Sequence, residues 1–363
     1  MRRVVKVSRI RIIITIIVVV LTTLLTGCTG KEPNEIAYVV ALGIDSTDDD
    51  NYKITIQYAN TTQISGGASE SGGKAGSEIV DNVTIEAPNI YAGVGLANNI
   101  VSKSFSMSHA KLIVFSKEIA EKGVKDMIET LVRSEEIRPD VFIAVANTTA
   151  NDYLTSVNPE MEVNPAQYYQ LIYQKNQLVG IPDGQLREFF TGLYTDNYDS
   201  ILPVAGVIEG AGGNSQNDDK GQSKDSQNEG SEGSSESLDS FESKNSDENE
   251  KEKDAEKNTS KYEYDIKNYV GGETAIEKKN KAEAIGAAVF EKDKMVGELG
   301  EVETEICKML KGDYTYSYLT YYNNDTPDIP ITVKTTQQKK PKYKIDTDKK
   351  TVDIELYIES DLY

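Results

Sequence analysis

Apolar and polar residues alternate with two different periods along this chain, and these periods predict both strands and helices. Residues 36–44 (IAYVVALGI) form a nearly continuous apolar run, and residues 53–59 (KITIQYA) alternate with the period of two of a half-buried strand. A polar turn from Asp45 to Asn51 separates the two runs, so a hairpin is predicted. Further strands are predicted over 79–85, 111–115 and 141–146.

Helical spacing appears between these strands. Pro88 is expected to open a helix over 89–101, because proline is favoured in the first helical turn. Residues 118–132 have apolar side chains at helical spacing and a polar face, which predicts one helix. A short helix is predicted over 149–157. No clean βαβ repeat is apparent, so the pattern favours an α+β fold with several domains and mostly antiparallel sheets.

Order is predicted to resume near Glu273, with a strand over 284–290, a turn over 291–294 and a returning strand at 295–296. Residues 301–310 have the spacing of a helix. Its predicted apolar face consists of Val302, Ile306, Met309 and Leu310, and Cys307 is interpreted as a core residue on the same side. Strands are predicted over 331–334, 342–345 and the regularly alternating 351–358.

Residues 211–260 differ in kind from the rest of the chain. They contain 14 acidic and 6 basic side chains and only four apolar residues. Such a segment buries too little surface to offset the entropy of ordering, so it is predicted to be a disordered acidic insert. The Gly- and Ser-rich residues 61–77 are predicted to be a mobile loop. The expected organisation is a signal peptide (1–27), an N-terminal α+β domain (28–209), an acidic linker (210–272) and a C-terminal domain (273–363).

The N-terminus carries the order of features found in a secretory signal. Five basic residues precede an apolar stretch from Ile12 to Leu25, which is followed by Thr26, Gly27 and Cys28. A cysteine directly after the cut indicates a bacterial lipoprotein signal, cleaved between Gly27 and Cys28. The Cys28 thiol is the nucleophile that takes up a diacylglyceryl group, and N-acylation is expected at the same residue. Two or more acyl chains hold a protein stably at a membrane.

Two other interpretations of this stretch remain open. The apolar stretch has about 14 residues, whereas a spanning helix needs about 20. A plain transmembrane anchor is therefore disfavoured. The other interpretation is an ordinary secretory signal followed by an accidental cysteine.

The charge of the chain excludes some partners. The formal net charge is −20, and it becomes −25 once the five basic residues of the signal are removed. This balance argues against nucleic-acid binding, which needs a basic surface. It also provides no attraction to anionic lipid headgroups. With two cysteines in the whole chain, one of them the predicted lipid site, no disulfide framework or cysteine-rich metal site is expected.

Four sets of residues could suggest chemistry, and each is better explained by structure. His109 is the only histidine and is interpreted as a hydrogen-bonding residue beside a buried strand. Gly93 and Gly95 resemble part of a dinucleotide fingerprint, but Asn98 occupies the position of the third glycine, so helix packing is the better interpretation.

The acidic residues offer no site either. Asp45, Asp48, Asp49 and Asp50 lack the EF-hand pattern and are interpreted as a solvated hairpin tip. Glu303 and Glu305 are two residues apart on a predicted helix, so they do not face each other as an acid–base pair. No catalytic constellation is found, and we expect no enzyme activity, metal or cofactor.

Four segments together resemble one protein family. They are residues 35–45 (EIAYVVALGID), 105–115 (FSMSHAKLIVF), 133–145 with Arg138-Pro139-Asp140, and 287–299 (AAVFEKDKMVGEL). With the preceding lipoprotein signal, their order is similar to that of the Ger(x)C lipoproteins, the C subunits of spore germinant receptors. Members commonly continue with a further helix-and-sheet region, so the C-terminal domain is expected to be incomplete here.

The resemblance implies a non-catalytic subunit that acts in nutrient-triggered spore germination. It implies assembly with an A-type and a B-type integral-membrane subunit, on the outer face of the cell membrane and in the inner membrane of the spore. The alternative is a substrate-binding lipoprotein of a membrane importer. That function requires two similar lobes around a cleft.

Overall fold

The computed structural model describes residues 3–24, 35–49, 51–59, 80–158, 162, 164–174, 180–208, 264–265, 268–274, 280–323 and 326–363. The predicted loop 61–77, the predicted cleavage site and residues 210–263 of the predicted linker lie outside this part of the chain. Residues Arg3–Leu24, which include most of the predicted signal, form helix α1.

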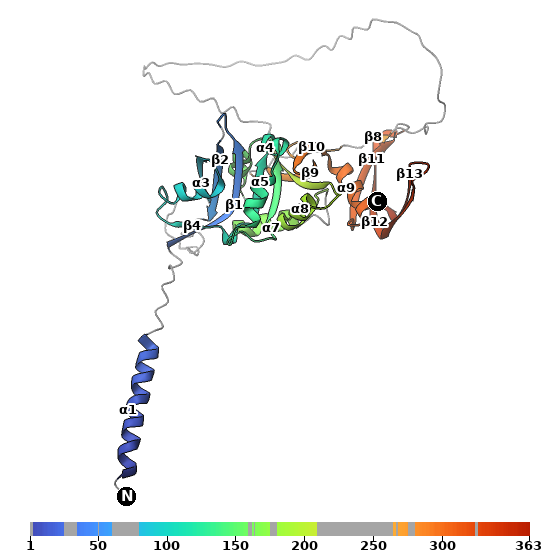
Figure 1. Ribbon diagram of the computed structural model, residues 1–363. Coiled ribbons are helices and arrows are strands. Elements are labelled where there is room, and N and C mark those ends of the chain that lie inside the picture. The colour runs from blue at the N-terminus through green and yellow to red at the C-terminus, as the bar shows by residue number, and fades with distance from the viewer. Residues whose placement is uncertain are drawn as a thin grey trace, which may run out of the picture.

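The larger of the two sheets in the described residues has nine strands in the order β10-β9-β7-β6-β5-β1-β2-β3, with β4 paired to β1 (Figure 1). The strands are β1 (Ile36–Ser46), β2 (Tyr52–Ala59), β3 (Val80–Ala87), β4 (Ser104–Ser106), β5 (Leu112–Ser116), β6 (Phe142–Ala146), β7 (Ser200–Val207), β9 (Ala282–Glu291) and β10 (Lys294–Leu299). The hairpin predicted from the apolar pattern is confirmed, since β1 and β2 pair in antiparallel register from Asp45 opposite Lys53 onward.

The centre of this sheet is parallel. β1 pairs with β5, β5 with β6, and β6 with β7 in parallel, while the strands at both sides are antiparallel. Parallel neighbours need a crossover, and helices α4 to α8 provide it between β5 and β7. The α+β class is confirmed, and the helices predicted over 118–132 and 149–157 do lie between these central strands, but the parallel pairing of the strands was not predicted. The long helical region after residue 158 was not predicted.

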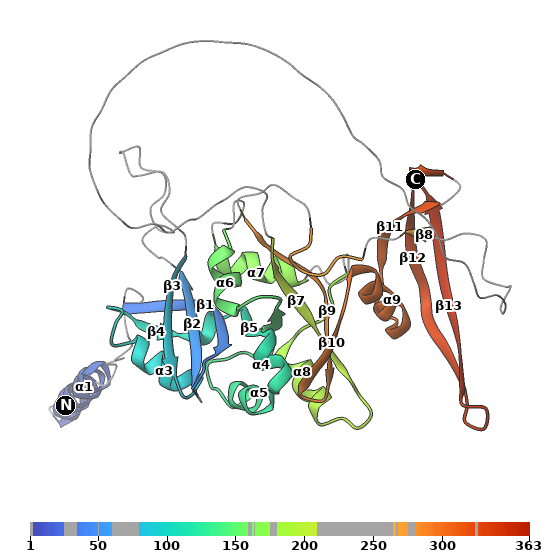
Figure 2. The same cartoon turned by 90° about the horizontal axis from the view of Figure 1, so that it is seen from above.

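Helices cover both faces of the sheet, as Figure 2 shows. Side chains of α3, α4, α5 and α8 join one buried apolar cluster, and those of α6 and α7 join the other. The helices are α3 (Ile90–Ala97), α4 (Lys117–Lys122), α5 (Lys125–Val132), α6 (Ala150–Ser156), α7 (Pro165–Gln174) and α8 (Leu186–Leu193), with a 3-10 turn η2 at Met107–His109.

The single helix predicted over 118–132 is two helices, α4 and α5, which meet at Gly123. Gly123 has a positive φ of 124°, a conformation that L-residues with a side chain avoid. The next amide, Val124 N, donates to Asp293 O at 3.0 Å in the turn between β9 and β10. This long-range contact holds the break in place, and apolar spacing alone does not reveal it.

A second, antiparallel sheet has the order β13-β12-β11-β8. Its strands are β8 (Tyr264–Asp265), β11 (Tyr316–Asn323), β12 (Thr326–Asp346) and β13 (Thr351–Leu362), and helix α9 (Glu301–Lys311) packs against β9 and β12. The predictions of separate strands over 331–334 and 342–345 are wrong, because both belong to β12. The polar residues between them pair with β13 through irregular register, so the strand continues.

The ordered part after the linker begins before Glu273. Tyr264 and Asp265 pair with β11. Gly271 N donates to Ile285 O at 3.0 Å, and Glu301 N donates to Tyr269 O at 2.7 Å. Strands β9 and β10 also complete the first sheet, so that sheet extends across the expected boundary between the two domains.

Candidate functional site

The predicted lipid site lies outside the described residues, because Gly27 and Cys28 both fall between 24 and 35. In the part of the chain that is described, no helix is both long and apolar enough to cross a membrane. The same part contains no group of three or more His, Cys, Asp or Glu side chains placed to hold a metal ion.

Asp45 does not belong to a solvated hairpin tip. Its carboxylate is buried and accepts hydrogen bonds from Ala150 N at 2.6 Å and Asn151 N at 3.0 Å, in the first turn of α6. Burial raises the pKa of Asp45, and the two backbone hydrogen bonds act in the opposite direction. Asp48 and Asp49 are exposed as predicted. Asp45 therefore anchors α6 to the sheet. The residues joined by this contact lie about a hundred positions apart in the sequence.

His109 and Gly93 have structural contacts. The exposed His109 ring meets Tyr38 edge-on, with centroids 4.7 Å apart, and its Nδ1 lies 3.0 Å from Ser108 Oγ. A Cβ on Gly93 would lie 2.6 Å from Ile54 Cδ1, so this glycine permits α3 to pack closely on β2. Both observations agree with the structural interpretation of these residues.

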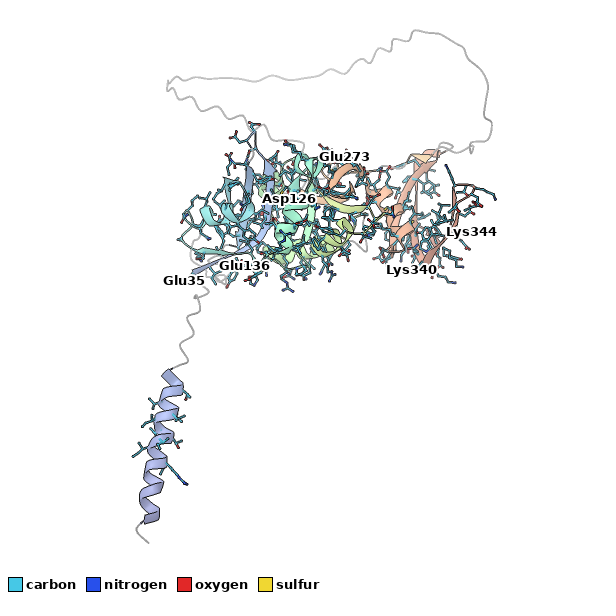
Figure 3. All side chains as sticks on the ribbon, in the orientation of Figure 1. Glu35, Asp126, Glu136, Glu273, Lys340 and Lys344 are labelled. Atoms are coloured by element: carbon cyan, nitrogen blue, oxygen red, sulfur yellow. The ribbon has the colours of Figure 1, made fainter. Side chains whose placement is uncertain are left out.

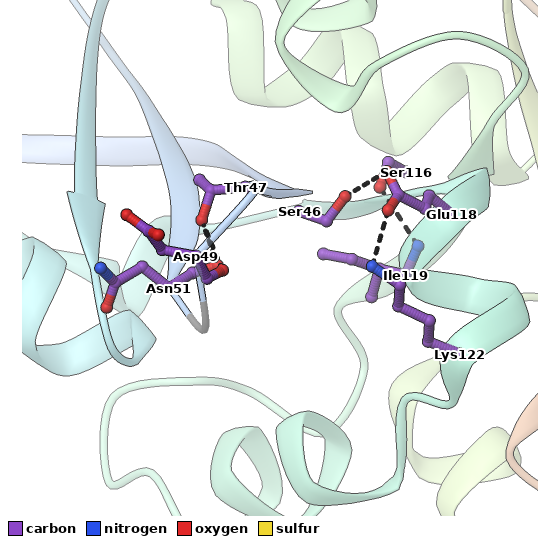
Figure 4. A network of polar contacts seen from close by, with 8 residues as sticks. All are labelled: Ser46, Thr47, Asp49, Asn51, Ser116, Glu118, Ile119 and Lys122. Carbon is purple, nitrogen blue, oxygen red and sulfur yellow. Dashed lines mark hydrogen bonds and ion pairs between the residues drawn. The ribbon is translucent and has the colours of Figure 1, made fainter.

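A polar network joins the end of β1 to the start of α4 (Figure 4). Ser46 Oγ donates to Glu118, and Lys122 Nζ lies 2.6 Å from the same carboxylate. Ser116 Oγ accepts from Ile119 N and caps the helix. The hydrogen bonds from Lys122 and then from Ser46 lower the pKa of Glu118. The contacts of Glu118 with Ser46 and Lys122 are exposed, whereas Ser116 is buried. The network connects β1 to α4 and suggests no chemistry of its own.

The hairpin of β12 and β13 has one apolar and one charged face. On β13 the apolar residues occur at every second position, and they are Val352, Ile354, Leu356, Ile358 and Leu362. Val352 is 55% exposed, and Ile345, opposite it on β12, is 68% exposed. Lysines and carboxylates face each other on the other side, in the pairs Lys344–Asp353, Lys342–Glu355 and Lys334–Asp361. Figure 3 labels Lys340 and Lys344 on this hairpin.

The exposed apolar face continues a face that is covered elsewhere in the same sheet. Ser317 lies opposite Thr335, and Thr335 lies opposite Ser360, so these three residues share the face of Ile358 and Leu362. Helix α9 covers Ser317 and Thr335, which are buried, and Ser317 Oγ donates to Glu305 Oε1 at 2.6 Å. Ser360 on β13 is exposed. The hairpin extends past β11 and α9 (Figure 2), and its apolar face is exposed there. An exposed apolar surface rimmed by charges marks an interaction site.

The buried face of α9 is polar, contrary to prediction. Thr304, Glu305 and Lys308 are buried together with Met309, whereas Ile306 is 48% exposed and Cys307 is partly buried. The helix is rotated from the predicted orientation because Ser317 and the carbonyl of Ile181 offer hydrogen-bond partners. Lys308 Nζ donates to that carbonyl at 3.1 Å.

This polar face has strongly perturbed ionisation. Burial raises the pKa of Glu305 to about 6 and lowers the pKa of Lys308 to about 8. From the sequence, Glu305 is considered only as a partner of Glu303, and Lys308 is not singled out. The available signal was their spacing of three on a helix, which places an acid and a base on one side.

A cavity of about 450 Å³ lies beside α9, between α8, β7 and the start of β11. Its charged lining consists of Asp183, Glu188, Lys308, Lys311 and Asp313. Lys311 Nζ lies 5.5 Å from the centre of the Tyr198 ring. Burial, and then the charge of Asp183, raise the pKa of Glu188. The lining thus combines acids and bases, and Ser200, Tyr198 and Tyr314 add hydroxyl groups.

Two family descriptions match this chain. Residues 30–207 match the spore germination protein N-terminal domain, and residues 285–363 match the spore germination B3/GerAC-like C-terminal domain. Together they cover more than half of the chain. The chain belongs to the GerAC family of spore germination proteins. No solved structure matches it.

Curated relatives of this germination protein align over shorter segments. Spore germination protein KC of Bacillus subtilis (strain 168) is 26% identical over 174 residues, which are 44% of this chain and 42% of the relative. Spore germination protein B3 of the same organism is 26% identical over 148 residues, 38% of this chain and 36% of the relative. Spore germination protein GerQC of Bacillus cereus is 27% identical over 104 residues, 28% of this chain and 29% of the relative. The chain thus spans less than half the length of these relatives.

Proposed function

We propose that this GerAC-family protein is a non-catalytic, lipid-anchored subunit of a spore germinant receptor. Cys28 carries the lipid and holds the folded part at the outer face of the cell membrane, which becomes the inner membrane of the spore. The protein acts there in nutrient-triggered germination. The family membership and the lipoprotein signal at residues 12–28 support this proposal.

The observation that carries the proposal is the exposed apolar face of the β12–β13 hairpin. In the assembled receptor this face contacts the A-type and B-type integral-membrane subunits. Burying a Val, Leu or Ile side chain completely contributes about 1.5–3 kcal/mol. Several such side chains lie in one row here, so covering them stabilises a complex without any further chemistry.

The importer alternative receives less support. A substrate-binding protein of that kind needs two similar lobes around a cleft. The described residues form a nine-stranded mixed sheet and a four-stranded antiparallel sheet, which differ in size, order and helix cover. The receptor function is therefore favoured over the importer function.

Cys28→Ser tests the anchor. We expect this variant to incorporate no labelled fatty acid and to remain uncut after Gly27, because serine lacks the thiol nucleophile. Cys307→Ser is the matched control, since it removes the other cysteine and should leave labelling unchanged. Fatty-acid labelling of the Cys28→Ser variant would contradict the assignment.

Ile354→Asn tests the contact surface, with Asp353→Asn as its control on the opposite face of the same strand. Both substitutions place asparagine at neighbouring, exposed positions of β13. We expect Ile354→Asn to reduce the amount of the integral-membrane subunits that co-purifies from spore membranes, and Asp353→Asn to leave it unchanged. Equal recovery with both variants would locate the contact elsewhere.

A further inference from the structure

Residues 87–102 form the longest stretch after residue 30 that lacks a charged side chain, in a chain whose formal net charge is −20. The stretch contains helix α3 and the loop that follows it. One side of α3 is buried on the sheet, but Leu96 is 47% exposed and Ile100 is 69% exposed. Asn98 and Asn99 are exposed beside them. Residues 96–102, here called the Ile100 loop, are therefore an uncharged and partly apolar part of a strongly acidic surface.

Hydrogen bonds hold the Ile100 loop in one shape. Ile100 N donates to Ala97 O at 3.0 Å, which continues the last turn of α3. Asn98 Oδ1 accepts from Phe105 N at 2.7 Å and so ties the start of the loop to β4. Because the backbone is already ordered, placing these side chains against a partner costs little conformational entropy.

The Ile100 loop lies at the end of the larger sheet where β1 begins. It leads into β4, and Ser104 of β4 pairs with Ile36, the first residue of β1. Ile36 is eight residues after Cys28, and eight residues span at most about 29 Å when fully extended. A lipid on Cys28 therefore keeps this end of the sheet within that distance of the bilayer. The other end of β1, near Asp48, is about 35 Å farther along the strand.

Charged residues of both signs surround the loop. Glu35 and Glu136 lie at this end of the sheet (Figure 3), and Lys103 and Lys111 directly precede β4 and β5. An acidic protein is repelled by anionic headgroups, and an uncharged loop approaches them without bringing a carboxylate out of water. Exposed apolar residues with a polar rim mark protein or membrane contacts. The nearby lipid site favours the membrane here.

We propose that the Ile100 loop contacts the bilayer, with Ile100 and Leu96 at the boundary between headgroups and acyl chains. The proposal rests on the proposed lipid anchor at Cys28. Such a small contact is weak in an untethered protein, but a tether makes it intramolecular and raises its occupancy. The contact orients the nine-stranded sheet, so that the start of β1 faces the membrane and the turn at Asp48 faces away.

A single introduced indole can report the contact, because the chain contains no tryptophan. The full chain with Cys307→Ser has Cys28 as its one thiol, and this thiol is coupled to a maleimide lipid in phosphatidylcholine vesicles. The tether is then present whether or not cells acylate Cys28. A failure of this test is thereby distinct from a failure of the anchor, which fatty-acid labelling measures. Bromine atoms on the acyl chains quench an indole that reaches the bilayer.

Ser102→Trp places the indole in the Ile100 loop, and Asp48→Trp places it at the opposite end of β1. Both positions are exposed. Interfacial side chains reach about 5–10 Å into the boundary of headgroups and acyl chains, so we expect brominated lipid to reduce the emission of Ser102→Trp at least about twofold. The emission of Asp48→Trp should not change.

Adding Ile100→Asp to Ser102→Trp should abolish the quenching, because a carboxylate is costly at the apolar boundary. Ile306→Asp is the matched control, since it adds the same charge at an exposed apolar position of α9 and should leave the quenching unchanged. The proposal is overturned if Ser102→Trp is quenched no more than Asp48→Trp, or if its quenching survives Ile100→Asp.

Discussion

Replacing Glu305 by glutamine should make the folded protein more stable at neutral pH. Glu305 is ionised above pH 6, where its charge is buried and one of its oxygens lacks a hydrogen-bond donor. Glutamine has nearly the same shape and no charge. The substitution therefore removes the cost of burying the charge while it keeps the packing of α9.

The size of the effect follows from the pKa. The pKa of Glu305 rises from 4.5 to about 6 on folding, and this value already includes the attraction of Lys308. Since one pKa unit corresponds to about 1.4 kcal/mol, ionised Glu305 destabilises the fold by about 2 kcal/mol. Glu305→Gln should raise the free energy of unfolding by about that amount at pH 7.5.

The raised pKa of Glu305 also determines how the free energy of unfolding changes with pH. Below pH 4.5 Glu305 is protonated in both the folded and the unfolded chain, so the penalty is absent. Between pH 4.5 and about 6 the unfolded chain loses its proton first, and the stability of the wild type falls as the pH rises. The advantage of Glu305→Gln should therefore be about 2 kcal/mol at pH 7.5 and close to zero at pH 4.

Amide hydrogen exchange of residues 301–311, followed by mass spectrometry, measures the opening free energy of α9 directly. Comparing variant and wild type at the same pH removes the pH dependence of intrinsic exchange. Glu303→Gln is the control, because a glutamine side chain can also accept the hydrogen bond that Gly300 N donates to Glu303. The reasoning is refuted if Glu305→Gln does not slow exchange at pH 7.5, or if it slows exchange equally at pH 4.

Two further predictions concern the larger sheet. Asp45→Ala removes the acceptor of two backbone hydrogen bonds at the start of α6 and should destabilise the fold by about 1–2 kcal/mol, whereas Asp48→Ala at the exposed turn should change the melting temperature little. Gly95→Ala should stabilise α3 by about 0.5–1 kcal/mol, since a Cβ there meets nothing within 4 Å. Gly93→Ala should destabilise by about 1–3 kcal/mol because its Cβ overlaps the buried Ile54, and equal melting temperatures for the two alanine variants would contradict this packing.

Strands of the larger sheet could be predicted where their own residues form a continuous apolar run or alternate between apolar and polar. The hairpin of β1 and β2 and the short strands β5 and β6 are apolar or alternating runs bounded by polar residues. Their parallel order was not predicted, because the local pattern of a strand does not specify its neighbours in the sheet, which are decided by contacts between residues far apart in the sequence. Long-range contacts also decided the break at Gly123, where Val124 bonds to the turn at Asp293.

Among the candidate sites, too, some follow from local sequence and others depend on tertiary contacts. The predicted lipid attachment at Cys28 rests on local sequence alone, because a peptidase and an acylating enzyme recognise a short segment. The buried carboxylate of Glu305, whose Oε1 accepts from Ser317 and whose Oε2 lacks a donor, depends on packing against β11. Its burial could not be inferred from helical spacing, which placed Ile306 inward instead.

By itself, the sequence determined the family, the acidic balance and the strands whose side chains alternate, and it predicts the N-terminal signal. These properties depend on residues that are neighbours in the chain. The tertiary structure alone decided that Asp45 anchors a helix, that α9 buries a charged face and that the apolar side of the C-terminal hairpin extends beyond its cover. Each of these depends on partners far away in the sequence, and burial and hydrogen bonding between such partners outweigh the local preference of the residues involved.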